Sequence, residues 1–491
     1  HIVSRRQRQM CIRDSNNDIP NQTKLKQCLH HLFLIDQQAS KYPFEDLLKS
    51  KIKRLGKKFN DLKKNPVTIE LDNGAIISCI ASFKDCSIFN MHTLIRKGVK
   101  NLVQENPSEI SISFIGSNAN DNWFESSVYV VLANSQSLPN LKKSAKSNPL
   151  KKLHVSGVAK KNLSKIIALV KGNTLTRNLT MTPPNQLTPT SYKSNIKKLA
   201  KQQKWTYKDF NMNQLKKMGA GAFVAVGQGS EPQDAAVVHL KYTNKKAKKT
   251  IALVGKGICF DTGGHNLKPA KFMSGMHEDM NGSAVALGIL HAATESKLPI
   301  NIDCWLAIAQ NHIGPKAYKQ NDVITALNGL SIEIVHTDAE GRMVLADTLT
   351  MASRKKPYAI MDFATLTGCM HVAMGDRYSG VISNKHELSS MAVEAGFKAG
   401  ERVAAFPYDE DYEEDLESQI ADIKQCTLEG GPDHIHAARF LGRFVEKDTP
   451  WLHMDLSSSN RKGGLGAIDS DVNGFGVNFG IKMLESFIEN D

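Results

Sequence analysis

Residues 254–268 read VGKGICFDTGGHNLK, and residues 335–342 read VHTDAEGR. The first stretch is an apolar run that stops at a carboxylate followed by glycines. This pattern is typical of a buried strand that ends in a tight turn. In open α/β sheets, functional side chains gather at the carboxyl ends of strands. We therefore expect polar residues in these two stretches to carry the chemistry.

The surrounding sequence predicts a sheet covered by helices. From about residue 178 onward, short apolar runs rich in β-formers alternate with helical stretches, which favours strands buried on both faces. The strands are expected at 223–229, 236–242, 250–257, 301–309, 359–368 and 380–384.

The first 177 residues predict a separate, smaller unit. Alternating residues 67–83 with a central Asp-Asn-Gly turn predict a hairpin, and residues 94–103 predict a helix. Further strands are expected at 110–116 and 128–134. The expected organisation is a non-structural segment at 1–20, an N-terminal α/β domain at 21–150, a linker with a connecting helix at 151–177 and a larger domain at 178–491.

Composition excludes several classes of protein. With 491 residues, 41% of them hydrophobic, the chain can bury a large core without disulfides. Its eight cysteines form no C-x-x-C pair, which favours a reducing, cytoplasmic setting. No apolar run is long enough to cross a bilayer, so no membrane partner is expected.

The net charge of +14 is unevenly distributed. Residues 1–250 carry 42 basic and 16 acidic side chains, whereas the remainder is net acidic. Residues 126–208 contain 16 Lys and Arg and no acid. This stretch is either a solvated lysine-rich face or a nucleic-acid surface, although its only aromatic residues are Tyr129, Tyr192, Trp205 and Tyr207.

Four carboxylates mark a metal site. Asp261 ends a strand, Asp338 and Glu340 lie one residue apart in VHTDAEGR, and Asp279 lies nearby in sequence. Clustered carboxylates repel one another unless cations neutralise them, and oxygen ligands suit Zn²⁺, Mn²⁺ or Mg²⁺. A single residue of this set is more simply a surface cap, but the set as a whole favours a metal.

Three cationic residues refine this hypothesis. Lys256 lies between two glycines in a buried strand, where burial should push it toward the neutral amine that can bind a metal. Lys268 and Arg342 supply positive charge where a reaction intermediate becomes negative.

Taken together, these motifs resemble those of the leucyl aminopeptidase family. The family signature N-T-D-A-E-G-R reads HTDAEGR here, and its V-G-K-G…F-D-S-G-G…K block reads VGKGICFDTGGHNLK. The likeness covers roughly residues 172–491. It implies an α/β fold in which a catalytic domain with a central mixed sheet flanked by helices is joined to a smaller N-terminal α/β domain. The implied activity is hydrolysis of the N-terminal amino acid from peptides.

The resemblance implies roles for individual residues and for the assembly. One metal site would comprise Lys256, Asp261, Asp279 and Glu340, and a second, more exchangeable site would comprise Asp261, Asp338 and Glu340. Two divalent ions (Mn²⁺ or Zn²⁺) per subunit, a catalytic Lys268, a bicarbonate held by Arg342 and a homohexamer would follow. The substrate's N-terminal residue would be bound by Met276, Thr365, Leu366 and Gly368.

Two other functions stay open at this level. The basic half leaves a nucleic-acid-binding protein with a secondary peptidase activity as the alternative. Carboxylate clusters also occur in two-metal phosphatases and nucleases. The sequence also departs from the family at Asn281, Ser283, His265, Asn266 and the histidine-rich residues 430–441.

Overall fold

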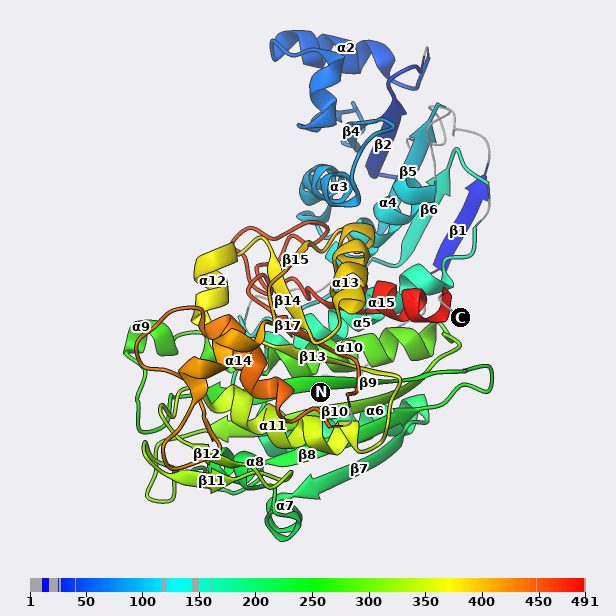
Figure 1. The fold of residues 1–491 in the computed structure, drawn as a ribbon. Helices are drawn as coiled ribbons and strands as arrows, with labels where there is room; N and C mark the ends of the chain where they lie inside the picture. Colours follow the sequence, from blue (N-terminus) through cyan, green and yellow to red (C-terminus); the bar gives the residue numbers. More distant parts are fainter. Residues whose placement is uncertain are drawn as a thin grey trace. The chain divides into compact units, whose positions relative to one another are not determined.

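The computed structural model describes residues 11–16, 25, 28–39, 41–116, 121–143, 150–159, 161–446 and 448–489. The chain forms two compact units (Figure 1). The smaller unit contains the described residues between 11 and 170 together with residues 462–473, and the larger unit contains the described residues of 171–461 and 474–489. The larger unit therefore holds every candidate site residue. Among the described residues, no helix is long and apolar enough to span a membrane.

The smaller unit has a six-stranded sheet in the order β1-β6-β5-β2-β4-β3. All neighbouring strands are parallel except β3 and β4, which form the predicted hairpin. The strands are β1 (Cys11–Asn16), β2 (His30–Asp36), β3 (Val67–Glu70), β4 (Ile76–Ser82), β5 (Glu109–Ile115) and β6 (Lys152–Ser156). The helices are α2 (Glu45–Arg54), η1 (Phe59–Lys63), α3 (Ile88–Val103) and α4 (Asp121–Asn134).

The larger unit has an eight-stranded mixed sheet in the order β15-β14-β17-β13-β9-β10-β8-β7. Its centre is parallel: β9 pairs with β10 on one side and with β13 on the other. The strands are β7 (Thr206–Asn211), β8 (Ala236–Tyr242), β9 (Thr250–Asp261), β10 (Asn301–Asn311), β13 (Ala359–Ala364), β14 (Ser379–Ser383), β15 (Val403–Ala405) and β17 (Trp451–Asp455). A small second sheet contains β11 (Val323–Thr325), β12 (Ser331–Glu333) and β16 (Ile423–Lys424).

Helices cover both faces of the central strands, which confirms the expected α/β class. In Figure 1, α10 (Asn281–Glu295) and α11 (Glu340–Ser353) lie on opposite sides of β9 and β10. Side chains of β9 alternate accordingly, and Ala252 and Val254 join α11 in one apolar core. The other helices and turns are α5 (Ser164–Thr180), α6 (Pro189–Gln203), α7 (Met212–Met218), α8 (Gly221–Gly227), α9 (Ala270–Met273), η2 (Met276–Met280), α12 (Gly368–Met374), α13 (His386–Ala399), η3 (Glu410–Leu416), α14 (Asp433–Gly442) and α15 (Val477–Glu489).

Two of the predicted strands are wrong. Residues 128–134 lie in α4 and residues 223–227 lie in α8. Both helices are buried around most of their circumference, so their sequences lack the polar stripe that identifies an amphipathic helix. A short, continuous apolar run of this kind cannot be distinguished from a buried strand by periodicity.

Two predicted boundaries also differ from the structure. Residues 152–156 lie in the expected linker but form β6, an inner strand of the smaller sheet. Cys11–Asn16 lie in the segment expected to be non-structural, but they form β1 and pair with β6. The rest of residues 1–20 lies outside the described residues. The lysine-rich flanks of residues 152–156 masked the short alternating strand.

Close packing of α10 on β9 requires glycine at residue 255. A Cβ added to Gly255 would lie 2.5 Å from the Ser283 Cα and 2.7 Å from the Gly282 carbonyl oxygen. We expect Gly255→Ala to lower the free energy of unfolding by about 1–3 kcal/mol because backbone atoms cannot move aside without strain. Chemical denaturation measures this loss. Gly368→Ala is the control, because nothing lies within 4 Å of its added Cβ, and an equal loss in both variants would contradict the packing argument.

Candidate metal centre

The candidate ligands converge at the carboxyl ends of neighbouring strands. Asp261 is the last residue of β9, Asn311 is the last residue of β10, and Thr365 follows β13 directly. These three strands are adjacent and parallel, so their ends meet at one edge of the sheet. Glu340 is the first residue of α11. The sheet and the start of this helix thus position side chains that lie far apart in the sequence.

Asp261, Asp338 and Glu340 form the centre of the site. One carboxylate oxygen from each lies within 4.8 Å of the others. Asp261 is fixed by two donors to Oδ1, the Gly263 N–H and the Asn311 Nδ2, each at 2.8 Å. Its orientation is therefore set before any ligand arrives. The three oxygens form a compact, hard-donor set that suits a divalent cation.

Asp279 completes the carboxylate set from η2. Its Oδ1 accepts a hydrogen bond from Thr365 Oγ1 at 2.7 Å and another from Lys256 Nζ at 2.8 Å. Its buried Oδ2 has no hydrogen-bond partner among the described residues. A buried carboxylate oxygen without a partner is costly. A divalent cation bound at this oxygen would remove that cost, so the residues fit a metal.

Lys256 lies in the middle of these carboxylates. Its Nζ is 2.8 Å from Asp279 Oδ1 and 2.9 Å from Glu340 Oε1, and it donates to the Thr365 carbonyl at 2.9 Å. Space for the side chain comes from Gly341, where an added Cβ would lie 2.7 Å from Nζ. Strand β9 and helix α11 therefore hold Lys256 at the predicted metal position.

The carboxylates around Lys256 also act on its charge state in the absence of a metal. Burial lowers the pKa of this lysine, but the negative charges of Asp279, Glu340 and Asp261 outweigh burial and raise it. Without a cation, the side chain is therefore an ammonium. The sequence argument considered burial but gave no weight to the surrounding carboxylates, which act in the opposite direction.

Burial and mutual repulsion raise the pKa values of three of the carboxylates. Burial, reinforced by the charge of Asp261, raises the pKa of Glu340 to about 8. Burial and the charges of Asp261 and Glu340 raise the pKa of Asp338 to about 7. Burial raises the pKa of Asp279 to about 6. Each shift records a cost of ionisation that bound cations would offset.

The two remaining catalytic candidates differ in their partners. Lys268 Nζ lies 3.0 Å from Asp261 Oδ2 and 2.5 Å from Asp338 Oδ1, at the open side of the cluster. Arg342 is buried in α11 and pairs with Asp433, both of whose carboxylate oxygens lie 2.9 Å from its Nη2. The bicarbonate expected at Arg342 stays a prediction.

Gln425 holds the ligand loop, and sequence reasoning missed it. Its buried side chain accepts hydrogen bonds from the backbone N–H groups of Val335 and His336 and donates one to the Ala339 carbonyl at 3.0 Å. Its own carbonyl accepts from Arg342 Nη1 at 3.1 Å. No motif surrounds Gln425, so its role could only be seen from the folded contacts.

Of the residues expected to bind the substrate, Thr365 lies at the carboxylate cluster. Thr365 contacts Asp279, and Leu366 follows it in the loop after β13. Asp455, also missed, accepts hydrogen bonds from the Leu366 and Thr367 N–H groups and fixes this loop. Met276 begins η2, and Gly368 begins α12 with open space beside its Cα. How these residues contact a substrate stays a prediction.

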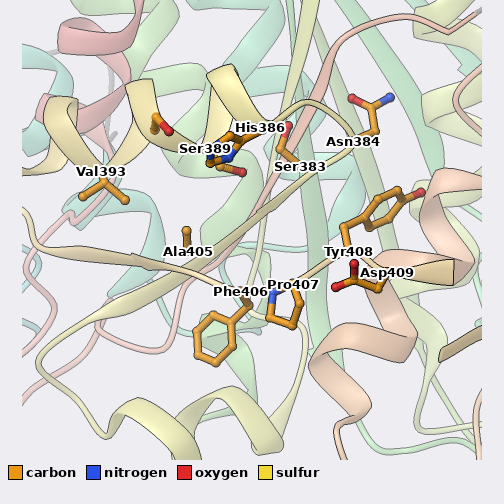
Figure 2. Close-up of a pocket in the computed structure, with 11 residues that line it drawn as sticks. Ser383, Asn384, His386, Ser389, Val393, Ala405, Phe406, Pro407, Tyr408 and Asp409 are labelled. Atoms are coloured by element: carbon orange, nitrogen blue, oxygen red, sulfur yellow. The ribbon is translucent and has the colours of Figure 1, made fainter. Parts of the chain in front are cut away.

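A separate pocket of about 620 Å³ lies beside α13 and β15 (Figure 2). Its described lining contains none of the candidate metal ligands. One of its lining residues, Phe406, packs its ring edge-on against His434 with 4.7 Å between centroids. The lining residues are Ser383, Asn384, His386, Ser389, Ser390, Val393, Ala405, Phe406, Pro407, Tyr408 and Asp409.

Comparison with known proteins agrees with this geometry. Residues 174–480 match the model of the cytosol aminopeptidase family, catalytic domain. A probable cytosol aminopeptidase of Stutzerimonas stutzeri is 44% identical over 60% of this chain and 59% of its own length. One from Nitrobacter winogradskyi is 38% identical over 67% of this chain and 65% of its own length. The match thus spans about 59–65% of the length of these curated relatives.

The matched residues 174–480 contain the eight-stranded sheet and the carboxylate cluster. The chain belongs to the cytosol aminopeptidase family. Among solved structures, the bottromycin maturation enzyme BotP in complex with Mn is similar, with a TM-score of 0.83, 25% identity and coverage of 94% of this chain and 99% of that chain. A second BotP structure gives a TM-score of 0.82.

We expect divalent cations to stabilise the chelator-treated protein. At a free Mn²⁺ or Zn²⁺ concentration 100 times Kd, the free energy of unfolding should rise by about 2.7 kcal/mol. Thermal unfolding with increasing metal measures the effect. Glu340→Gln should remove most of it, whereas Glu394→Gln, an exposed residue paired with Lys398 on α13, should not. Equal stabilisation of both variants would place the metal elsewhere.

Proposed function

We propose that this protein is a metal-dependent aminopeptidase that removes the N-terminal amino acid from peptides. The observation that carries this proposal is the combination of a buried lysine with four carboxylates beside the carboxyl end of strand β9. A lysine among metal ligands is not required to bind a phosphate ester. The combination, together with family membership, favours a peptidase over a two-metal phosphatase or nuclease.

Two ions would be shared by the carboxylates. Lys256, Asp261, Asp279 and Glu340 would hold the tighter ion, and Asp261, Asp338 and Glu340 the more exchangeable one. The Mn in a solved relative supports Mn²⁺ as one candidate, and Zn²⁺ is the other. When bound, such ions polarise the peptide carbonyl and lower the pKa of a water molecule toward neutrality.

The side chains of this protein would orient the substrate. Asp279 would bind the free α-ammonium group, which restricts cleavage to the terminal residue. Lys268 would stabilise the negative charge that develops on the carbonyl oxygen, because its ammonium lies at the open side of the cluster. Met276, Thr365, Leu366 and Gly368 would surround the terminal side chain.

The nucleic-acid alternative gains no support from the basic stretch. Single-stranded nucleic acid is bound by aromatic rings that stack on bases. Of the four aromatic residues in 126–208, Tyr129, Tyr192 and Trp205 are buried. The fourth, Tyr207, is half-buried, and Lys197 Nζ lies 5.8 Å from the centroid of its ring. A single half-buried ring is a poor stacking surface for successive bases, so the lysines of this stretch are better explained as a solvated face.

The assembly and setting proposed here follow from the family. A homohexamer enclosing its active sites would admit short peptides and exclude folded proteins. A cytoplasmic setting is supported by seven cysteines that are free among the described residues. Sedimentation analysis of the full chain tests the hexamer, and a purely monomeric species would contradict it.

Asp338→Asn should lower kcat on leucine amide by about 100-fold or more, the scale of losing one key transition-state contact. The substitution keeps the size of the side chain but removes the charge that a cation needs. Steady-state hydrolysis after metal loading measures the effect, and circular dichroism checks the fold.

The matched control is Asp411→Asn, because Asp411 is an exposed acid in η3 away from the cluster. It should retain full activity. Undiminished hydrolysis by Asp338→Asn would exclude the two-metal assignment, and faster cleavage of p-nitrophenyl phosphate than of leucine amide would favour a phosphatase.

A further inference from the structure

The guanidinium of Arg342 already has an anionic partner within the chain. The Arg342 side chain is 3% exposed, and its Nη2 lies 2.9 Å from both oxygens of Asp433. Its Nη1 donates to the Gln425 carbonyl. A buried guanidinium without a counter-charge is costly, so this carboxylate neutralises a charge that would otherwise need an external anion.

The Arg342–Asp433 pair lies beside the candidate metal centre. Arg342 comes two residues after the ligand Glu340 in the first turn of α11. Gln425 links the same arginine to the loop that carries Asp338.

Asp433 reaches Arg342 from a specific place in the fold. It is the first residue of α14 and follows Gly430, Gly431 and Pro432. Both glycines have positive φ, 78° and 95°, a backbone conformation that residues with a Cβ rarely adopt. The turn therefore directs the start of α14, and with it the Asp433 carboxylate, to the guanidinium.

We propose that Asp433 permanently fills the anion position of Arg342, so that the reaction of this enzyme does not use bicarbonate. This inference rests on the proposed aminopeptidase function. An attached carboxylate competes at an effective concentration in about the millimolar range or above, and it does not lose translational freedom on pairing. A dissolved anion must displace it to reach the arginine.

The first test uses the unaltered chain. We expect kcat on leucine amide to be unchanged between bicarbonate-free buffer and saturating bicarbonate. We also expect no binding of ¹³C-labelled bicarbonate by the metal-free protein in NMR titrations. A bicarbonate-dependent rise in kcat together with saturable binding would overturn the proposal.

The second test removes the carboxylate that pairs with Arg342. Asp433→Ala should lower kcat by about tenfold or more with a smaller effect on KM, because the buried arginine loses a charge-assisted partner. Bicarbonate or formate should then restore part of kcat and raise the Tm of the metal-free variant. The control is Glu429→Ala, an exposed acid four residues earlier, which should lack both responses.

The binding and stability measurements need no turnover. If the protein lacks peptidase activity, the proposed function fails, whereas anion binding gained only by Asp433→Ala still supports Asp433 as the partner of Arg342. If Asp433→Ala gains neither anion binding nor anion-dependent stability, the assignment of Asp433 is wrong even in an active peptidase. If the variant does not fold, the titration of the unaltered chain decides.

Discussion

The structure depends on holding four carboxylates closer together than their charges favour. Asp261, Asp338 and Glu340 offer oxygens within 4.8 Å of one another, and Asp279 contacts the same lysine as Glu340. Mutual repulsion of this kind is strong in a buried setting. Lys256 compensates it from the interior of the sheet. Without a metal, protons on the carboxylates and the ammonium group of Lys256 reduce this repulsion. Divalent cations that bound here would take over that role.

Close packing of the surrounding helices holds the carboxylates in this arrangement. All fourteen residues of α11 are buried, so the helix that presents Glu340 cannot shift without disturbing the core. On the opposite face, α10 approaches β9 and β13 so closely that an added Cβ on Gly282 would lie 2.1 Å from the Phe363 carbonyl oxygen. Ligands mounted on such elements lose little freedom on binding, which favours affinity and a fixed geometry.

The candidate metal ligands could be predicted from the sequence because each lies in a short motif. In such a motif, the residues that set the local backbone stand next to the residue that carries the chemistry. Asp261 and Asp338 could be recognised from a few neighbouring residues. Gln425 could not, because it acts through backbone groups about 90 residues away. The helix α8 was mistaken for a strand for a related reason: its burial is a tertiary property. The protonated state of Lys256 likewise depends on charges that only the fold brings near.

The order of these contacts along the chain has a consequence for synthesis. The candidate metal ligands all precede residue 341, but the residues that hold their surroundings come later in the chain. Gln425 fixes the loop that carries Asp338, Asp433 pairs with Arg342, and Asp455 fixes the Leu366 loop. A nascent chain that has emerged from the ribosome only as far as Glu340 lacks these three residues. The reaction centre can therefore be assembled only after residue 455 has left the ribosome, and shorter nascent chains carry the candidate ligands without the residues that align them.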